Sequence, residues 1–343
     1  MNINLPPQAN TTSSSPTSQT VSVPTDLSVL SSNSASDLIK KAALQYQLDQ
    51  IIQRNENQEF IITGATVNDL QTGQTIYNHN QDTSQFAASL NKIPIAWLLL
   101  QDLRAGKVHL SDTLSWSASN VSAGYGFYDQ PGAPTSATVQ QLIQDMLNRS
   151  GNTAVRILVN QTSLDGPLAV NSRLAQYPKL VQTRLQLLGP SSFFLGNTTP
   201  SEGMWLMEQL QKNKDSYEQI MQNAMATNIF TDFGVRSQLA GNSYIQLANK
   251  VGILDDTDAG SNRHDEGIIY NSNTHRAYGY SLMTTNFSQD LSANGPAEES
   301  LKEMGLVILR FAGDQPNTTP QAQPLIQTPH FQEMPSANKK ILY

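Results

Sequence analysis

Apolar residues recur along the chain with two periods, which predict where helices and strands lie. A helical period runs through residues 37–53 and again through residues 297–313. The apolar faces of these two predicted helices hold Leu38, Ala42, Leu44, Leu48, Ile51 and Ile52, and Leu301, Met304, Val307, Ile308 and Phe311. Short β-branched runs within residues 60–80, separated by Asn68-Asp69 and Thr72-Gly73, predict a β-hairpin instead.

Strand character returns near the other end of the chain. Three runs, residues 244–254, 266–272 and 276–286, are rich in β-branched and aromatic residues and have turn residues between them. The stretch from Ser89 to about Leu210 is dominated by helical patterns and by Gly/Pro-rich loops. Because strands lie at both ends and helices between them, we expect an α+β fold. It would hold one antiparallel sheet built from both chain ends and flanked by helices, with an inserted all-helical lobe.

Composition divides the chain into three parts. Residues 1–35 are rich in Ser, Thr and Pro and residues 314–343 in Pro and Gln, so both are predicted to be flexible, with the folded domain at residues 36–313. The net charge of −7 and the lack of a Lys/Arg run argue against nucleic-acid binding. No apolar run reaches the roughly 18 residues that span a membrane, and no signal-like segment begins the chain.

Cysteine and histidine limit the chemistry further. The chain has no cysteine, which excludes disulfides, thiolate nucleophiles and cysteine-bound metals. The five histidines show no metal-ligand spacing and are expected on the surface or in loops; they are His79, His109, His264, His275 and His330. We therefore expect no metal and no cofactor.

The pair Ser89 and Lys92 is a candidate for nucleophilic chemistry. On a helix, this spacing places both side chains on one face, and the positive end of the helix dipole favours a serine alkoxide. Pro94 fits only the opening turn of a helix, so the helix is predicted to begin close to Ser89. The same spacing recurs at Ser336 and Lys339. Spacing alone therefore leaves open that Ser89 is only a polar residue at the N-terminal end of a buried helix.

Two further motifs carry polar groups of the right kind. Ser150-Gly151-Asn152 offers a hydroxyl that can relay protons and an amide that can bind a substrate carbonyl. Alternatively, its serine or asparagine caps the helix that comes next. Lys250-Val251-Gly252 offers a positive charge on a strand that a ligand can approach closely at the glycine. The alternative there is a strand edge with a solvated lysine.

Taken in order, Ser-x-x-Lys, Ser-x-Asn and Lys-x-Gly resemble the motifs of the penicillin-recognising serine hydrolases, namely class A β-lactamases and their transpeptidase and carboxypeptidase relatives. The resemblance extends from about Ser36 to Gly313. Residues 86–114 resemble the nucleophile helix and the segment after it, 146–159 the helix of the second motif, 195–210 the end of the Ω-loop, and 264–270 and 278–286 the last two strands. The resemblance implies the β-lactamase/transpeptidase-like fold.

The resemblance also implies catalytic roles. Ser89 would attack the carbonyl of a β-lactam or a D-alanyl peptide, and Lys92 would take its proton. Ser150 would relay the proton to the leaving nitrogen. Lys250 would attract the substrate carboxylate and tune Ser150.

Substrate-binding roles are implied for a second set of residues. Asn152 would hold the substrate amide, and Val251 and Gly252 would form the strand that borders the cleft. The N–H groups of Ile253 and of the nucleophilic serine would form the oxyanion hole. Tyr125 would be the aromatic wall of the cleft.

The chain departs from the family pattern where deacylation is concerned. Class A β-lactamases carry a glutamate in the Ω-loop that activates the deacylating water. Residues 166–201 contain no Asp or Glu, the loop looks shortened, and the place of the carboxylate falls near Leu188-Gly189. Because general bases contribute about 10²–10⁴-fold to rates, we expect weak or absent β-lactamase turnover.

Other departures concern substrate binding. Val251 stands where the family usually has Thr or Ser, whose hydroxyl binds the substrate carboxylate, and Gly151 stands where it has Asp. Glu266 stands about where many β-lactamases have a carboxylate-binding arginine, for which Arg263 or Arg276 could substitute.

These motifs support three hypotheses. The leading one is a serine hydrolase that forms an acyl-enzyme on Ser89 and has impaired deacylation. A β-lactamase that uses another base, such as Lys92, and a catalytically retired envelope scaffold or binding protein of the same fold are the alternatives. We expect a monomer that acts on peptidoglycan-type ligands outside the cytoplasm (secreted, periplasmic or cell-envelope), with its export signal absent from this chain.

Overall fold

The computed structural model describes residues 32–57, 61–189, 192–213, 215–239, 243–255, 261–287 and 294–313. Most of the two segments predicted to be flexible, 1–35 and 314–343, lies outside these residues, as do His330 and the second Ser-x-x-Lys pair. The chain divides into two compact units, residues 1–39 and residues 40–343. The second unit holds every candidate site residue.

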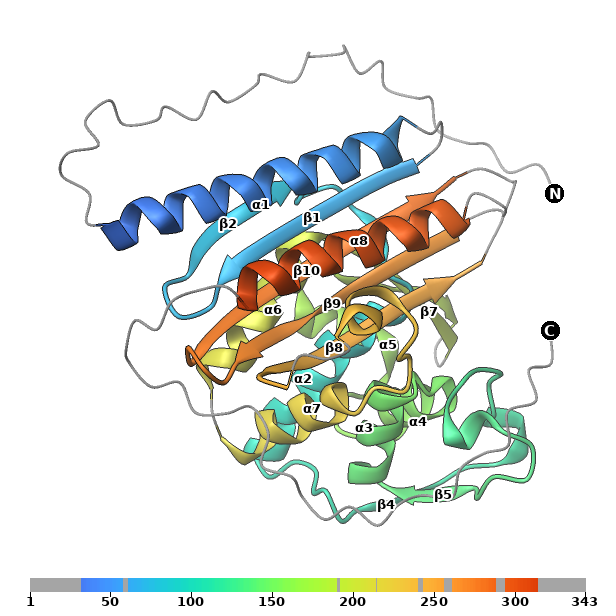
Figure 1. Cartoon of the computed structure of the whole chain (residues 1–343). Helices are drawn as coiled ribbons and strands as arrows, with labels where there is room; N and C mark the ends of the chain where they lie inside the picture. Colours follow the sequence, from blue (N-terminus) through green and yellow to red (C-terminus); the bar gives the residue numbers. More distant parts are fainter. Residues whose placement is uncertain are drawn as a thin grey trace. The chain divides into compact units, whose positions relative to one another are not determined.

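The central sheet has five antiparallel strands in the order β2-β1-β10-β9-β8 (Figure 1). They are β1 (Ile61–Asp69), β2 (Gln74–His79), β8 (Ile245–Leu254), β9 (Ser261–Asn271) and β10 (Arg276–Asn286). The predicted hairpin and the three later strands are thus confirmed, as is a single sheet made from both chain ends. β8 forms one edge of the sheet, and Lys250 lies there opposite Glu266.

One face of the sheet is covered by α8 (Asn294–Gly313) and by the part of α1 (Ser32–Glu56) that follows Lys40 (Figure 1). The buried side chains of this core include Leu44, Leu48, Ile51 and Ile52 of α1 and Leu301, Met304, Ile308 and Phe311 of α8. The two apolar faces read from the sequence are confirmed at these positions. Leu38 and Ala42 are exposed, so the predicted face was too wide at its start.

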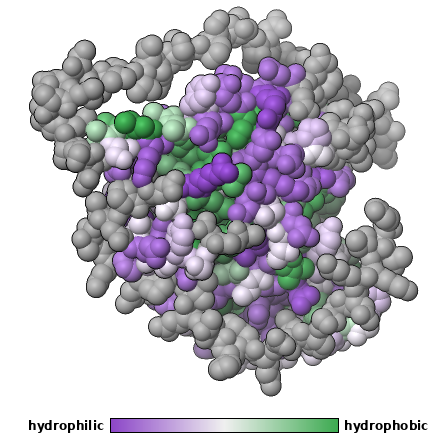
Figure 2. Space-filling view, in the orientation of Figure 1, coloured by the Kyte–Doolittle hydropathy of each residue, from purple (hydrophilic) through white to green (hydrophobic). Residues whose placement is uncertain are grey.

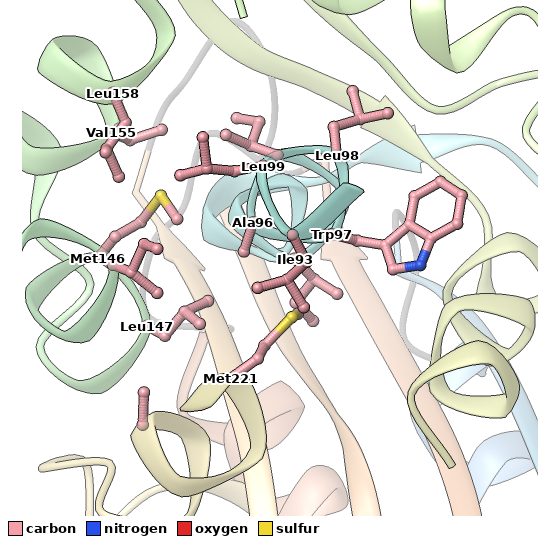
Figure 3. Close-up of a cluster of buried hydrophobic side chains, with 14 of the residues drawn as sticks. Ile93, Ala96, Trp97, Leu98, Leu99, Met146, Leu147, Val155, Leu158 and Met221 are labelled. Carbon is pink, nitrogen blue, oxygen red and sulfur yellow. The ribbon is translucent and has the colours of Figure 1, made fainter. Parts of the chain in front are cut away.

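The other face of the sheet packs on an inserted lobe that is helical at its core. Its helices are α2 (Lys92–Arg104), α3 (Val139–Asn148), α4 (Asn152–Gln161), α5 (Gly166–Leu174), α6 (Pro200–Lys212) and α7 (Ser216–Ala226). α2 lies at the centre, and Figure 3 shows side chains of α3, α4 and α7 gathered around it. α2 is apolar on almost every side, with eleven buried residues, as expected for a central helix.

The inserted lobe also carries short strands and single turns that the sequence pattern did not predict. The strands are β3 (Gln85–Phe86), β6 (Arg184–Gly189) and β7 (Ser192–Thr198) in one small sheet, and β4 (Thr113–Ser115) and β5 (Ser136–Thr138) in another. The 3₁₀ turns of the lobe are η2 (Ala88–Asn91), η3 (Ala118–Asn120) and η4 (Phe127–Asp129), whereas η5 (Gly234–Gln238) packs against α8 on the other face of the sheet. The β6–β7 hairpin and η2 border the candidate site.

The face of the molecule in Figure 2 is mostly hydrophilic, with small apolar areas among the polar ones. Among the residues that the structure describes, no helix combines the length and the apolar character that crossing a membrane requires.

Candidate active site

Ser89 lies in η2, which runs directly into α2 at Lys92. The predicted helix start is confirmed, with Pro94 in the first turn of α2. Ala88, directly before the serine, has a φ of 45°, which a residue with a Cβ adopts only when its surroundings force it. Ser89 is partly exposed, whereas Lys92 is fully buried beneath it, and Lys92 Nζ lies 3.0 Å from Ser89 Oγ.

The structure brings the second motif to the same place. Ser150 follows α3 and has a φ of 60°, a second strained position beside the site. Its Oγ lies 3.1 Å from Lys92 Nζ and 2.9 Å from Lys250 Nζ, so one hydroxyl joins the two lysines. The Ser150 carbonyl also accepts a hydrogen bond from Lys92 Nζ at 2.6 Å. We call Ser89, Lys92, Ser150 and Lys250 the serine–lysine cluster.

Burial changes the protonation of the cluster. Lys92 and Lys250 both have 0% exposed side chains. Burial lowers the pKa of Lys92 to about 7, although the negative charges of Asp129 and Asp145 act in the opposite direction. Burial, reinforced by the positive charge of Lys92, lowers the pKa of Lys250 well below its usual range. A neutral amine 3.0 Å from a serine hydroxyl can accept its proton, which is the arrangement general-base catalysis needs.

A groove of about 740 Å³ opens above the cluster. It is lined by Phe86, Ala88, Ser89, Ser122, Asn152, Val155, Arg156, Gln186, Phe193, Phe194, Leu195, Ile253 and Leu254. Ser89 therefore faces the groove, while the two lysines and Ser150 lie beneath it. None of these lining residues is acidic.

The residues proposed to bind substrate take different positions around this groove. Asn152 lines it, and its Oδ1 accepts a hydrogen bond from Lys92 Nζ at 2.8 Å. Ile253 lines it from the edge strand β8. Gly252 lets β8 approach η2, because a Cβ there would lie 3.0 Å from the carbonyl oxygen of Ala87. These three residues are brought together with Ser89.

The side chains of Val251 and Tyr125 do not line the groove. The Val251 side chain is buried in the core beneath α8, and only its carbonyl, which accepts from Lys250 Nζ at 2.7 Å, belongs to the site. Tyr125 is 60% exposed and does not line the groove. Its ring packs edge-on against Phe230 at 5.2 Å, and Lys250 Nζ lies 6.0 Å from the Phe230 ring. Phe230 could not be predicted as a neighbour of the site from the sequence, because a single aromatic residue in a loop has no pattern that marks such a role.

Two buried carboxylates support the second motif and were also missed. Asp129 accepts hydrogen bonds from the backbone N–H of Asn152 at 3.0 Å and of Thr153 at 2.7 Å, and so caps α4 from a distant turn. The residue at the N-cap itself, Gly151, has no side chain to do so. A Cβ on Gly151 would overlap Asp145 Oδ2, so this position leaves no room for a side chain such as aspartate. Burial raises the pKa of Asp145 to about 6.

These findings correct two alternatives that the motifs had left open. Neither Ser150 nor Asn152 caps α4, since Asp129 does. Lys250 lies on an edge strand, as the second alternative supposed, but it is fully buried rather than solvated. Both motifs therefore point inward to the same cluster.

Glu266 and the two nearby arginines do not face the groove. The Glu266 carboxyl is buried close to Gly203 of α6, accepts a hydrogen bond from Ser281 Oγ at 3.2 Å, and has its pKa raised to about 8 by burial. It is therefore protonated at neutral pH and cannot repel a substrate carboxylate. Arg263 pairs with Asp255 at 2.7 Å, and Arg276 Nη1 lies 3.9 Å from a carboxylate of β1.

The histidine expectation is wrong for His264, which is fully buried on β9. Its Nε2 lies 2.9 Å from the carbonyl oxygen of Phe86, and its Nδ1 accepts a hydrogen bond from the Thr284 N–H at 3.1 Å. Burial lowers its pKa to about 4, so the ring is neutral. The ring ties the start of the nucleophile segment to the sheet. Within the described ranges, no group of three or more acidic or histidine side chains could hold a metal ion.

The segment matched to the Ω-loop forms the β6–β7 hairpin and contributes Gln186, Phe193, Phe194 and Leu195 to the groove. Neither Leu188 nor Gly189 lines it. The first acid after the hairpin, Glu202, accepts hydrogen bonds from the N–H groups of Gln182 and Thr183 at the base of the hairpin. Its carboxylate thus holds the hairpin and does not enter the groove. The side-chain amide of Asn91 binds carbonyls of the same hairpin, which joins η2 to it.

The fold and the site together define a serine hydrolase fold with a buried lysine beside Ser89. The sequence profile of the beta-lactamase enzyme family matches residues 43–311. The chain belongs to this family, and the resemblance drawn from the motifs is confirmed. No curated protein matches the sequence.

Solved structures with the same fold share little sequence with this chain. PBP-A has a TM-score of 0.65 at 18% identity, covering 78% of this chain and 96% of PBP-A. A leucine-to-glutamate variant of PBP-A, solved as an acyl-enzyme complex with penicillin G, is similar at 19% identity with the same TM-score and coverage. The β-lactamase of Sphaerobacter thermophilus DSM 20745 has a TM-score of 0.64 at 20% identity, covering 78% of this chain and 97% of that enzyme. At these identities, the likeness establishes the fold.

Proposed function

We propose that the protein is a serine hydrolase that forms an acyl-enzyme on Ser89 with β-lactams or D-alanyl peptides. Neutral Lys92 removes the proton of Ser89 Oγ, 3.0 Å away, while Oγ bonds to the substrate carbonyl carbon. The carbonyl C–N bond then breaks, and the proton passes from Lys92 through Ser150 Oγ, 3.1 Å from Lys92 Nζ, to the leaving nitrogen. The products of this step are an ester on Ser89 and a neutral amine.

The other site residues bind and polarise the substrate. The N–H groups of Ser89 and Ile253 stabilise the oxyanion, and donors of this kind contribute about 10²–10³-fold to rates. Lys250 holds the Ser150 hydroxyl, 2.9 Å from its Nζ, and attracts the substrate carboxylate when its amine is protonated. Asn152, which lines the groove, binds the amide of the acyl part.

The observation that carries the proposal is the burial of two lysines against two serine hydroxyls. Burying an amine in this way destabilises its charged form and thus the fold, so such clusters are found where chemistry requires them. A retired scaffold would gain stability by replacing these lysines with apolar residues. This favours the catalytic hypothesis over the scaffold hypothesis.

Slow deacylation follows from the lining of the groove. No carboxylate lies among the described residues that line the groove. The first acid after the hairpin, Glu202, binds backbone N–H groups at the base of the hairpin instead. Without a base beside the ester, water attack loses a contribution of about 10²–10⁴-fold. The buried Val251 side chain offers no hydroxyl to a substrate carboxylate either. We therefore propose a long-lived acyl-enzyme rather than efficient β-lactamase turnover, and action outside the cytoplasm, where such substrates occur.

Labelling with a fluorescent penicillin tests the proposal. The wild-type protein is compared with Ser89→Ala and with Ser84→Ala, which removes an exposed serine five residues earlier. Labelling of the wild type and Ser84→Ala, with none of Ser89→Ala, is the expected result. Equal labelling of Ser89→Ala would exclude Ser89 as the nucleophile. Absence of label in the folded wild type would favour the scaffold hypothesis.

A further inference from the structure

The groove continues beyond Asn152 along α4. Arg156 follows Asn152 by four residues, which places it about one helical turn further on the same face of α4. The β6–β7 hairpin contributes Gln186, Phe193 and Phe194 to the lining of the same groove. The lining of the groove therefore combines one cationic side chain with an aromatic wall formed by Phe193 and Phe194.

Arg156 has no partner within the described part of the chain. Its guanidinium is partly exposed, and it makes no ion pair or side-chain hydrogen bond there. Arg104 and Arg173 differ in this respect, since each pairs with an aspartate, at 2.7 Å and 2.6 Å. Arg156 is also the one charged residue among the described residues that line the groove.

Such a guanidinium selects for an anion. Its planar array of N–H donors matches the two oxygens of a carboxylate, and the aromatic wall lowers the local dielectric, which strengthens the attraction. The protein as a whole carries a net charge of −7, so an anionic substituent would be repelled elsewhere on the surface. Recognition of an anion on the α4 side of the groove thus depends on Arg156.

We propose that Arg156 and the β6–β7 hairpin form a subsite for an acyl group that carries its own carboxylate next to an aromatic or alkyl portion. The inference rests on the proposed function, in which Asn152 binds the amide of the acyl part and the leaving group lies toward Lys250. The carboxylate meant here is separate from the one that Lys250 attracts. The preferred acyl donors therefore bear two negative charges, one on each side of the scissile bond.

Two penicillins that differ in one group test the subsite. Benzylpenicillin and its α-carboxy analogue share the phenyl ring and the β-lactam nucleus, and only the second has a carboxylate on the acyl side chain. The second-order rate constant for acylation of Ser89 is measured for both by intact-protein mass spectrometry. The proteins compared are wild type, Arg156→Gln, Arg156→Lys and Arg310→Gln, the last removing an exposed arginine of α8 as a control.

We expect the wild type and Arg310→Gln to react about 5–10-fold faster with the carboxylated penicillin. The ratio should fall to about one in Arg156→Gln and be partly retained in Arg156→Lys, while the rate with benzylpenicillin changes little. An equal ratio in the wild type and Arg156→Gln would overturn the subsite and leave the proposed function intact. If neither penicillin acylates the wild type, the proposed function fails, and the subsite fails with it.

Discussion

The protonation of Lys92 should govern how fast Ser89 is acylated. Lys92 accepts a proton only when neutral, and burial brings its pKa from 10.5 to about 7. Since one pKa unit corresponds to about 1.4 kcal/mol, the buried site disfavours the charged amine by about 5 kcal/mol. With a pKa of about 7, roughly three quarters of the molecules hold a neutral Lys92 at pH 7.5, and roughly a tenth at pH 6. Acylation should therefore slow about fivefold from pH 7 to pH 6 and about tenfold for each further unit below pH 6.

Removing a negative charge near Lys92 should shift the pH dependence of acylation. The carboxylates of Asp129 and Asp145 stabilise protonated Lys92 and so raise its pKa. Asp145→Asn keeps the shape of the side chain and removes one negative charge. The pKa of Lys92 should fall, and the midpoint of the acylation profile should move to lower pH.

Stopped acylation reactions with benzylpenicillin, followed by mass spectrometry from pH 5 to 10, measure both profiles. The expected wild-type midpoint is near pH 7, with a lower midpoint for Asp145→Asn. A wild-type midpoint near pH 10 would show that Lys92 keeps an ordinary pKa and would refute its role as the neutral base. A midpoint that moves upward in Asp145→Asn would refute the electrostatic explanation.

Three further outcomes concern the structure around the site. Gly151→Ala should lower the rate of Ser89 acylation by at least about 100-fold, because the new Cβ overlaps Asp145 Oδ2. The double variant Gly151→Ala/Asp145→Ala should recover part of this rate, as measured by labelling with a fluorescent penicillin. Glu266→Gln should raise the free energy of unfolding at pH 8 by about 1–3 kcal/mol in urea titrations. The pKa of Glu266 is about 8 in the folded state and 4.5 when unperturbed, so between these values the unfolded chain binds fewer protons than the folded chain. The free energy of unfolding of the wild type therefore falls as the pH rises from about 4.5 to 8. Glu266→Gln should lose this dependence on pH. Asn91→Ala should lower the Tm by about 3–8 °C in calorimetry, because it leaves hairpin carbonyls without donors; an unchanged Tm would show that this amide does not hold the hairpin.

The parts of the fold that could be predicted are those set by neighbouring residues in the sequence, namely turns and the apolar faces of helices. The β1–β2 hairpin follows from its turn residues, and the buried face of α8 follows from a helical period. Ser89 and Lys92 could be paired because three residues on a helical turn bring side chains together whatever lies around them. Ser150 and Lys250 could be placed beside them only through the family resemblance, since they are 100 residues apart in sequence.

The parts that were missed depend on tertiary partners. Asp129 caps a helix that begins 23 residues later, and nothing near it in sequence marks it as a cap. His264 is buried because its two nitrogens find backbone partners on separate elements. The β6–β7 hairpin replaces an expected loop, and its aromatic residues line the same groove as Arg156 of α4 only in the folded chain. Such long-range pairings carry no periodic signal.

The most direct test of the central claim, a working nucleophile with poor deacylation, is the lifetime of the adduct on Ser89. Wild type and Ser89→Ala are incubated with benzylpenicillin, excess drug is removed, and intact mass is followed for hours together with peptide mapping. The expected result is an added penicillin mass on the peptide that contains Ser89, which persists over hours and is absent from Ser89→Ala. An adduct that decays within seconds while drug is consumed would contradict slow deacylation, and no adduct at all would contradict acylation at Ser89.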